Sequence, residues 1–443
     1  MGKKVLVIGA ARSGLAGAEF LAKQGNQVVL TDMKQVEQVD NLAALGVSFI
    51  WGEQPDVAAI QPDYIVMSPG VPLTIAPVKY AQAHGIPVIG ELELAYRHCK
   101  APFVAITGTN GKTTTTTLIG ELLKKTGKQV FVGGNIGVPL ISYVNQLDAD
   151  DIVVAEVSSF QLETIETFCP HLALMINLTP DHLDRHGDMA GYLAAKARIF
   201  ENQKESDYLV LNYDDVTLRE LRSQSNGKVI FFSQQHKLEE GVYLDDNQVM
   251  LALNGQTVAI CKADEIAIKG KHNLENAMGA IAFAYLSGVT PEDIRDVLMT
   301  FQGVEHRLEP VRTLNDVLYI NDSKGTNPDS TIKAIEAYDR PIVIILGGKN
   351  KGIAFTNLAQ LVKQRVKKAV VLGQAKADIV SALQEAGFSD YVVTDTFEDA
   401  VKTAAGLAEP GDIVLLSPAC TSWDMFSSYE ERGQLFKEIV SAL

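Results

Sequence analysis

The segment FVAITGTNGKTTTTTLIG, residues 103–120, places a lysine and a run of threonines directly after a glycine-containing turn. An apolar stretch typical of a buried strand precedes the turn, and a helical pattern follows it. Glycines let backbone N–H groups approach phosphate oxygens, the helix start adds positive dipole, and the lysine can neutralise the outer phosphates. The next threonine can offer its hydroxyl to Mg²⁺. The pattern predicts a nucleotide phosphate site made by Gly108, Thr109, Asn110, Gly111, Lys112, Thr113 and Thr114.

This turn departs from the standard phosphate-binding loop, which has a glycine six residues before the lysine. Ile106 stands at that position here. The alternative is a glycine turn that caps an ordinary helix beside a surface lysine, but the order Gly-Lys-Thr after an apolar strand favours the nucleotide site. Because successive helix residues point about 100° apart, most of the threonines at 114–117 must pack or cap instead of binding metal.

A second set of polar residues follows two other strand-like runs. Glu156 ends the run DIVVAE, and Asp181 and His182 follow LALMINLTP. Open α/β sheets bind ligands at the carboxyl ends of their strands, so these side chains are expected beside the phosphate loop, where they would make a Mg²⁺ site. Taken singly, Glu156 could be a solvated strand end, and His182 could be a structural histidine.

The elements that must position these residues recur three times along the chain. An apolar run ends in a glycine-rich turn at KKVLVIGAARSG, PFVAITGTNGKT and PIVIILGGKNKG, and helical patterning follows each one. Each start is typical of a buried parallel strand. Residues 206–270 alternate polar and apolar residues and contain Asn254-Gly255, a strong hairpin signal, so an antiparallel sheet attached to the middle of the chain is expected there.

We therefore predict an α/β protein of three domains, in line with a length of 443 residues. These are a Rossmann-like N-terminal domain, a central P-loop ATPase-type domain with a small antiparallel sheet, and a Rossmann-like C-terminal domain. Linkers are expected near 98–102 and 301–306, where proline or glycine follows a helical stretch. The predicted domain limits are 1–98, 99–303 and 304–443.

Composition narrows the class of protein. Apolar residues make up 47% and charged residues 21%, as in ordinary soluble globular chains. A formal charge of -15 argues against nucleic acid or an anionic membrane as the main partner. The cysteines are far apart and form no C-x-x-C pair, which favours a reducing compartment over a disulfide framework. With no apolar run long enough for a signal peptide or a spanning helix, a cytoplasmic protein is expected.

The N-terminal segment resembles a dinucleotide-binding fingerprint, because VLVIGAARSG is followed by Asp32 about 20 residues later. Ala11 replaces the middle glycine, which disfavours close approach to a pyrophosphate. An NAD-dependent dehydrogenase is therefore a weak alternative.

Several motifs together are similar to those of the Mur ligase family of peptidoglycan synthesis. They run in order through nearly the whole chain and include TGTNGKTT, EVSSFQLE, NLTPDHLDRH, YLAAKARIF, GKHNLENAMGA, HRLE, NDSKGTNPDS and SPACTSWD. The short phosphate loop is that family's own form. The resemblance implies an ADP-forming ligase that joins a carboxylate to an amine through an acyl phosphate and a tetrahedral intermediate. It implies ATP, UDP-N-acetylmuramoyl-L-alanine and D-glutamate as partners, and a monomer.

The resemblance also implies roles for individual residues. Lys112, His182 and Lys196 would be catalytic, and two Mg²⁺ ions would be held by Thr113, Glu156, His182 and Lys196. An ammonium would repel Mg²⁺, so Lys196 is expected to be carbamylated by CO₂, as in relatives; without the resemblance, a snorkelling lysine on an amphipathic helix would be the favoured interpretation. Further ATP contacts would come from Asn273, Asn276, Arg307, Asp322 and Lys324.

Two more sets complete the implied site. The uridine nucleotide would contact Arg12, Ser13, Asp32, Lys34, Gly70, Asn135 and His182. D-Glutamate would contact Thr326, Lys351, Ser422, Trp423 and Tyr429, where the last two aromatic residues are departures that bear on pocket shape. Ser422 could alternatively, or additionally, cap a helix.

Two other functions remain open at this point. Folylpolyglutamate synthetase shares the central fold, although SPACTSWD and the Rossmann-like first domain count against it. An ATP-gated regulatory protein without turnover is the other alternative, and the full set of Lys112, Thr113, Glu156, His182 and Lys196 counts against that.

Overall fold

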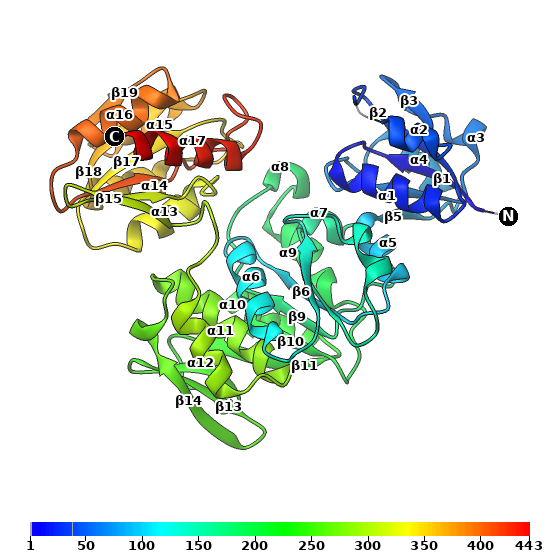
Figure 1. The fold of residues 1–443 in the computed structure, drawn as a ribbon, viewed down its shortest axis with the longest axis horizontal. Coiled ribbons are helices and arrows are strands. Elements are labelled where there is room, and N and C mark those ends of the chain that lie inside the picture. Colours follow the sequence, from blue (N-terminus) through cyan, green and yellow to red (C-terminus); the bar gives the residue numbers. More distant parts are fainter. Residues whose placement is uncertain (1, 38) are drawn as a thin grey trace.

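The computed structural model describes residues 2–37 and 39–443, and their strands form three sheets. Each sheet with its helices makes a separate α/β region, and Figure 1 shows the N- and C-terminal regions on either side above the central region. The predicted α/β class and three-part architecture are confirmed. The predicted limits 1–98, 99–303 and 304–443 each enclose one sheet.

The N-terminal region is a five-stranded parallel sheet in the order β3-β2-β1-β4-β5. Gly9, after the first strand, has φ +97°, and a Cβ on Gly14 would lie 1.8 Å from the Gly9 carbonyl oxygen, so this turn needs both glycines. The elements are β1 (Lys4–Ile8), α1 (Arg12–Lys23), β2 (Gln27–Asp32), α2 (Asp40–Ala44), β3 (Ser48–Trp51), α3 (Val57–Ile60), β4 (Tyr64–Met67), α4 (Ala76–Ala83), β5 (Val88–Gly90) and α5 (Glu91–His98).

The central region contains one nine-stranded sheet in the order β14-β13-β12-β11-β10-β9-β6-β8-β7. Its strands are β6 (Phe103–Thr107), β7 (Val130–Gly134), β8 (Ile152–Glu156), β9 (Leu172–Met175), β10 (Tyr208–Asn212), β11 (Lys228–Ser233), β12 (Gly241–Asp245), β13 (Gln248–Leu253) and β14 (Gln256–Lys262). Its α-helices are α6 (Lys112–Lys124), α7 (Ser159–Leu162), α8 (Leu183–His186), α9 (Met189–Ala197), α10 (Val216–Glu220), α11 (Lys271–Leu286) and α12 (Pro291–Thr300).

The expectation of an antiparallel sheet over residues 206–270 is correct only for its second half. β12, β13 and β14 pair antiparallel, and Asn254 and Gly255 form the two-residue hairpin turn with φ of +54° and +74°. β10 and β11 instead pair parallel and continue the main sheet. Both are largely buried, and α10 connects them, so they follow the crossover rule for parallel strands.

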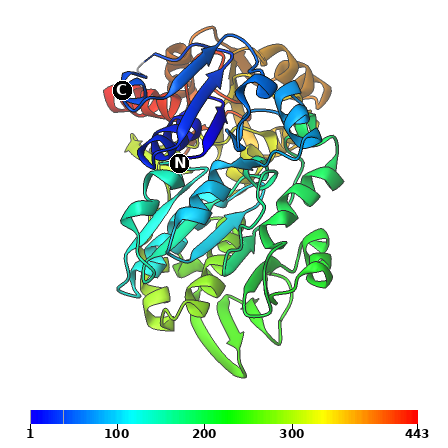
Figure 2. The same cartoon turned by 90° about the vertical axis from the view of Figure 1, so that its right-hand side faces the viewer.

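The C-terminal region is a six-stranded sheet in the order β15-β16-β20-β17-β18-β19, in which only β15 runs antiparallel to its neighbour. Its elements are β15 (Glu309–Leu314), β16 (Val317–Asn321), α13 (Pro328–Glu336), β17 (Ile342–Gly347), α14 (Thr356–Arg365), β18 (Val366–Leu372), α15 (Lys376–Glu385), β19 (Tyr391–Val393), α16 (Phe397–Leu407), β20 (Ile413–Leu416) and α17 (Tyr429–Ala442). Seen from the side, the N- and C-terminal regions lie at the same end of the central region (Figure 2).

Apolar packing joins two of the three regions. One continuous cluster of buried side chains includes Val7 and Leu30 of the N-terminal sheet together with Phe103 and Phe168 of the central region. The C-terminal region has two clusters of its own, whose described members all lie between Leu308 and Val440. Across residues 2–37 and 39–443, none of the helices combines the length and apolar character that crossing a membrane would need.

Candidate active site

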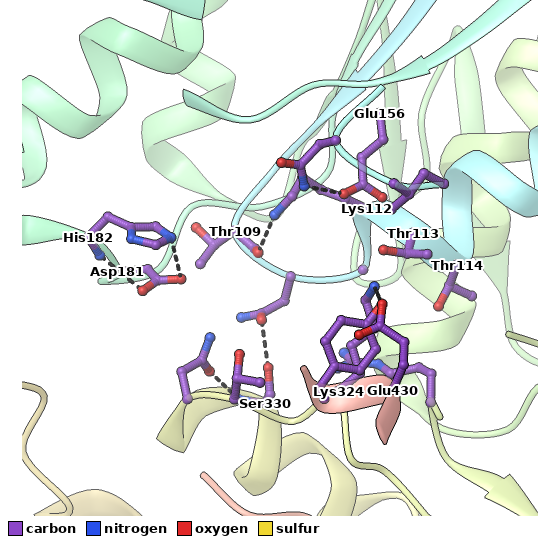
Figure 3. Close-up of a pocket in the computed structure, with 18 of the residues that line it drawn as sticks. Thr109, Lys112, Thr113, Thr114, Glu156, Asp181, His182, Lys324, Ser330 and Glu430 are labelled. Carbon is purple, nitrogen blue, oxygen red and sulfur yellow. Dashed lines mark hydrogen bonds and ion pairs between the residues drawn. The ribbon is translucent and has the colours of Figure 1, made fainter. Parts of the chain in front are cut away.

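The three regions meet at a cavity of about 260 Å³ beside the carboxyl ends of β6, β8 and β9 (Figure 3). These parallel strands are neighbours, so the residues after them are brought to one edge of the sheet. All three regions contribute to the lining of the cavity. Arg12 comes from the N-terminal region, and the loop residues Thr109 to Thr114 with Glu156 and His182 come from the central region. The C-terminal region contributes Arg307, Lys324, Thr326, Ser330, Lys351, Tyr429 and Glu430.

The phosphate loop is held in shape by its own glycines and by a neighbouring strand end. Gly108 and Gly111 have φ of +151° and +80°, and a Cβ on Gly111 would lie 2.1 Å from the Asn276 side-chain oxygen. The backbone N–H groups of Thr109 and Asn110 both donate to Asn177 Oδ1, at 3.2 and 2.9 Å. The loop is therefore fixed before any ligand binds.

Lys112 lies over this loop, and its Nζ donates to the carbonyls of Gly108 and Thr109 at 3.0 and 2.8 Å. Burial lowers the pKa of Lys112, while Glu156 and Asp181 act in the opposite direction. Two of the later threonines pack inside the protein, as the turn of the helix leads one to expect. Thr115 and Thr116 are fully buried inside α6 and point away from the cavity lining, so packing is their role.

Glu156 provides the most direct indication of a cation. It ends β8, is 1% exposed, and its Oε1 accepts a hydrogen bond of 2.7 Å from Asn135. Oε2 is buried without a hydrogen-bond partner among the described residues. A buried, unpaired carboxylate oxygen is costly unless a cation or donor meets it. Together with the Thr113 hydroxyl, which lines the same cavity, it fits the oxygen ligands that Mg²⁺ prefers.

His182 precedes α8 in a left-handed conformation, with φ +53°. Burial lowers its pKa to about 4, with Lys351, Lys112 and Lys196 acting in the same direction against Asp181. The imidazole is therefore neutral at physiological pH and can ligate a metal. Its ring packs edge-on against Phe160 at 4.7 Å.

Lys196 is only 1% exposed, on α9 beneath the loop. Its Nζ donates to the Gly108 carbonyl at 2.7 Å and lies 4.6 Å from the centre of the Tyr192 ring. Burial, and then the neighbouring Lys112, lowers its pKa well below the usual lysine value. A snorkelling lysine would keep its ammonium in water, so that interpretation is excluded.

The C-terminal region reaches the loop through polar contacts. Ser330 Oγ donates to Asn110 Oδ1 at 2.8 Å, and the Asn110 amide and Thr179 hydroxyl both bond to Asp329. In the same cavity, Lys324 Nζ donates to the Tyr429 hydroxyl at 2.8 Å. Arg307, Lys324 and Thr326 also line the cavity.

A second cavity of about 280 Å³ adjoins the first, and its lining contains Lys196, Thr326, Lys351, Ser422, Trp423 and Tyr429. The Ser422 hydroxyl is buried and has no hydrogen-bond partner in the described chain, while Trp423 is 67% exposed at the rim. Ser422 does not cap a helix as the alternative allowed. α17 begins at Tyr429, and Ser428 is its N-cap.

Two smaller cavities belong to the N-terminal region. One of about 220 Å³ is lined by Asp32 and Gly70, and one of about 190 Å³ between the N-terminal and central regions by Arg12, Ser13 and Asn135. The Asp32 carboxylate accepts the N–H groups of Ala10 and Lys34 at 2.7 and 2.9 Å, which closes the turn after β1.

Some predicted contacts lie outside these cavities. Five predicted site residues are absent from the described lining of the four cavities, namely Lys34, Gly108, Asn273, Asn276 and Asp322. Lys34 is exposed, and Asn276 is buried on α11, where its amide abuts Gly111. Asp322 is buried, accepts a 2.7 Å hydrogen bond from Ser417, and lies 4.0 Å from Arg307. Asn276 therefore packs against the phosphate loop, and Asp322 lies beside Arg307.

Sequence reasoning missed three residues that hold the site together. Asn177 and Ser330 contact the phosphate loop directly, and each lies inside a motif used for the resemblance. Arg432 is fully buried on α17; its guanidinium donates to the Ser323 carbonyl at 2.7 Å and the Cys420 carbonyl at 3.3 Å. It joins the loops after β16 and β20. No sequence pattern indicated a buried arginine there.

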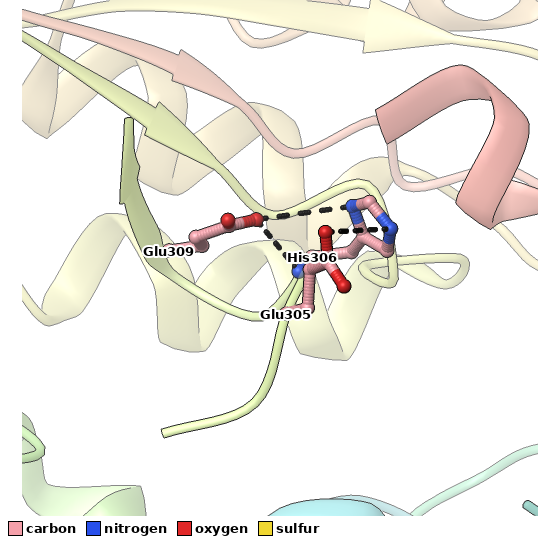
Figure 4. A group of neighbouring side chains, drawn as sticks. All are labelled: Glu305, His306 and Glu309. Carbon is pink, nitrogen blue, oxygen red and sulfur yellow. Dashed lines mark hydrogen bonds and ion pairs between the residues drawn. The ribbon is translucent and has the colours of Figure 1, made fainter. Parts of the chain in front are cut away.

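A separate cluster near the second linker, Glu305, His306 and Glu309, has side chains close enough to hold a metal (Figure 4). Lys437 already pairs with both carboxylates, at 2.6 and 3.0 Å, and the Asn321 amide lies 2.9 Å from His306 Nδ1. These contacts satisfy the cluster, which anchors the start of the C-terminal region to α17.

Comparisons with known proteins agree along the whole chain. The family models described as "Mur ligase MurD-like, N-terminal domain", "Mur ligase middle domain" and "Mur ligase, glutamate ligase domain" match residues 3–90, 106–284 and 306–420. Solved structures show the same fold at low identity. UDP-N-acetylmuramate-alanine ligase from Thermotoga maritima has a TM-score of 0.61 at 19% identity, covering 99% of both chains. MurF from Acinetobacter baumannii has 0.63 at 17%, covering 98% of this chain and 93% of that one.

Relatives are similar at much higher identity. The UDP-N-acetylmuramoylalanine--D-glutamate ligase of Pelotomaculum thermopropionicum is 52% identical over 445 residues, covering 100% of this chain and 98% of the relative. The ligase of the same name from Clostridioides difficile is 45% identical over 449 residues, covering 100% and 99%. With three family models in order along the chain and relatives of 45–52% identity covered almost end to end, the chain belongs to the Mur ligase family.

Proposed function

We propose that the protein is an ATP-dependent ligase that adds D-glutamate to UDP-N-acetylmuramoyl-L-alanine. The observation that carries this proposal is the adjacency of the two main cavities. They share six lining residues, namely Lys112, Asn135, His182, Thr326, Lys351 and Tyr429. A phosphoryl group bound by the loop and an amine bound in the second cavity would therefore meet at one place. The high identity to two ligases of this name supports the substrates.

In this proposal the chain acts mainly by positioning and charge neutralisation, as phosphoryl transfer requires. The loop N–H groups and Lys112 hold the outer phosphates of ATP. The γ-phosphoryl passes to the substrate carboxylate, the amine of D-glutamate attacks the acyl phosphate, and phosphate leaves from the tetrahedral intermediate. We propose two Mg²⁺ ions, which would neutralise charge at the phosphates. Glu156, Thr113 and His182 would hold them.

We propose that Lys196 completes the metal site as a carbamate. Two observations support this role: the side chain is buried beside the loop, and its lowered pKa favours the neutral amine, which is the form that reacts with CO₂. The product would be an anion in a pocket that also contains the Lys112 ammonium. The modification would therefore place a negative charge beside the Lys112 ammonium, which is a favourable contact.

The remaining cavities are proposed to bind the other two substrates. D-Glutamate would bind in the second cavity, where Ser422 offers an unpartnered hydroxyl and Lys351 a positive charge. The uridine nucleotide would bind across the N-terminal cavities, near Asp32, Gly70, Arg12 and Ser13. Contact of the C-terminal region with the loop would exclude water from the acyl phosphate. Asn273, Asn276 and Asp322 are proposed to support the ATP site, and Lys34 the uridine site.

We further propose a setting for this activity. The protein would act as a monomer in the cytoplasm, in peptidoglycan precursor synthesis and hence in cell shape and division.

A phosphate-release assay tests the proposal. ATP turnover is expected only when UDP-N-acetylmuramoyl-L-alanine and D-glutamate are both present. A folate substrate supporting turnover would indicate folylpolyglutamate synthesis instead. An absence of turnover with every substrate combination would favour a regulatory protein and refute the ligase.

Lys112→Ala is expected to reduce acyl phosphate formation by about a thousandfold or more, because charge neutralisation at the phosphates carries much of the catalysis. Single-turnover trapping of the acyl phosphate measures it. Lys128→Ala, an exposed lysine on the loop after α6, is the matched control and should keep normal activity. A normally active Lys112→Ala would remove the loop from the mechanism.

Lys196→Ala is expected to lose most activity and to regain part of it when a short carboxylate such as formate or acetate is added. The carboxylate would replace the carbamate oxygens near the metal. Mass spectrometry under CO₂, with an expected carbamate on residue 196, gives an independent readout. Unchanged activity in this variant would exclude Lys196 from the site.

A further inference from the structure

Arg185, on α8, is the residue through which the N-terminal region touches the helix that follows His182. Its guanidinium donates to the carbonyls of Pro69 and Val71, at 3.0 and 3.3 Å, in the loop after β4. It also pairs with Glu163 at 2.5 Å, and both side chains are mostly buried. The same guanidinium lies 4.3 Å from the centre of the Phe160 ring.

Two of these partners, Val71 and Phe160, border different cavities. Gly70 and Val71 line the cavity of the N-terminal region that contains Asp32. Phe160 lines the second cavity, next to Lys196 and Ser422, and its ring packs against His182. α8 begins directly after His182. Arg185 thus connects the loop at one pocket with the histidine and the aromatic wall at another.

A purely structural arginine makes a different set of contacts. Arg198, next to α9, donates to the carbonyls of Leu162, Glu163 and Ile165 at 2.7 Å each and pairs with Glu201. All of these partners lie in the central region. Arg185 also contacts the α7 segment, but two of its N–H groups donate to carbonyls of the N-terminal region. Arg185 therefore links two regions of the molecule, whereas Arg198 supports only the central region.

Resting on the proposed function, we propose that Arg185 is a positioning residue that couples occupancy of the sugar-nucleotide pocket to the phosphate and acceptor sites. A sugar nucleotide that fixes the 69–71 loop fixes both carbonyl acceptors of Arg185. The guanidinium then holds α8 and Phe160, and with them His182, in one arrangement. Such coupling is reciprocal: the sugar nucleotide strengthens ATP binding by the same factor as ATP strengthens sugar-nucleotide binding.

Isothermal titration of the full-length protein tests the coupling. The probe is Mg²⁺ with an ATP analogue whose β–γ bridging oxygen is replaced by NH, titrated with and without saturating UDP-N-acetylmuramoyl-L-alanine. In the wild type, the sugar nucleotide is expected to tighten binding of the analogue by about fivefold or more. In Arg185→Gln, the ratio of the two dissociation constants is expected to fall to within about twofold of unity.

Two further variants keep the test decisive. Arg198→Gln loses carbonyl contacts at the same helix and should lower the melting temperature while keeping the wild-type coupling ratio. Arg185→Lys retains the charge and the pair with Glu163 but cannot reach both carbonyls, so it should fold and still lose most of the coupling. If Arg185→Gln does not fold, the lysine variant decides.

The outcomes are separable. A wild-type coupling ratio in Arg185→Lys, or no coupling in the wild type, would overturn the inference while leaving the ligase assignment intact. Failure of the wild type to bind the sugar nucleotide at all would instead contradict the proposed function.

Discussion

The two interfaces of the central region are built from different interactions. Against the N-terminal region, Tyr96 of α5 packs edge-on against Phe103 and Phe168, at 5.5 and 5.4 Å, inside a shared apolar cluster. Against the C-terminal region, the described contacts near the phosphate loop are polar: Asn110 with Ser330, Asn110 and Thr179 with Asp329, and Asp181 with Lys351 at 3.9 Å.

This difference indicates which region can move. Separating the first interface would expose aromatic and aliphatic surface, at a cost of about 25 cal/mol per Å² of apolar area. The polar contacts of the second can be exchanged for water at little net cost, because each intramolecular hydrogen bond contributes only about 1 kcal/mol. We infer that the N-terminal and central regions behave as one body, and that the C-terminal region closes on it.

The largest expected effect comes from Glu93→Ala, at the first interface. The buried carboxylate of Glu93 accepts the N–H groups of Glu166, Thr167 and Phe168 and pairs with Arg97 at 2.7 Å. Burial tends to raise its pKa, but the hydrogen bonds from Thr167, Glu166 and Arg97 lower it overall. Removing the carboxylate leaves these donors unpaired, so we expect a loss of roughly 3–5 kcal/mol in the free energy of unfolding.

Urea unfolding at pH 7 measures this loss. Because the folded-state pKa is lowered, the contribution of Glu93 is present at neutral pH and is lost as the pH falls through the folded-state value. The difference in stability between the wild-type and Glu93→Ala proteins should therefore shrink as the pH falls through the lowered pKa of Glu93. A loss smaller than 1 kcal/mol at pH 7 would show that the two regions are not one body.

An intermediate effect is expected from Glu91→Gln, two residues earlier on the same helix. Glu91 is fully buried and accepts the Ile141 N–H at 2.7 Å; burial raises its pKa to about 7 against the backbone bonds. Because the pKa of Glu91 is higher in the folded than in the unfolded state, the protonated carboxyl contributes fully to the free energy of unfolding below about pH 4.5. This contribution is lost as the pH rises through about 7. A shift of that size corresponds to roughly 3 kcal/mol.

We therefore expect Glu91→Gln to be more stable than the wild type at pH 8 and nearly equal to it at pH 5. Thermal melts at the two values measure the difference. Glu93→Gln is the matched control on the same helix, and it should be less stable than the wild type at pH 8. A pH-independent difference for Glu91→Gln would mean that its carboxyl group does not titrate between these values.

The smallest effect on stability is expected from Asp329→Ala, at the second interface. Its partly exposed side chain holds Asn110 and Thr179, so its loss should cost about 1 kcal/mol or less. If closure depends on these contacts, the KM for ATP should rise by up to about tenfold, the ratio that 1.4 kcal/mol represents. Small-angle scattering should show a larger radius of gyration for the variant, and an unchanged radius and KM would contradict a mobile C-terminal region.

The sequence allowed prediction of features with a local physical signal. Asn254-Gly255 specified a hairpin turn because both residues tolerate positive φ, and the three apolar runs before glycine turns became β1, β6 and β17. Glu156 was placed correctly because strand ends of one sheet converge. Features that depend on distant partners were not predictable. The parallel pairing of β10 with β11 depends on the neighbouring β9, and Asn177 or Arg432 acquire their roles only from loops far away in sequence.

The buried guanidinium of Arg432 also implies an order of events while the chain is being made. The loops that contain Ser323 and Cys420 reach their final form only when α17 is available to bridge them. Nascent domains generally fold from the N-terminal side as synthesis proceeds. The phosphate loop and its sheet, finished by residue 300, can therefore mature on the ribosome well before residue 432 emerges. The second cavity, lined in part by Thr421, Ser422 and Trp423, is the last part of the site to be completed.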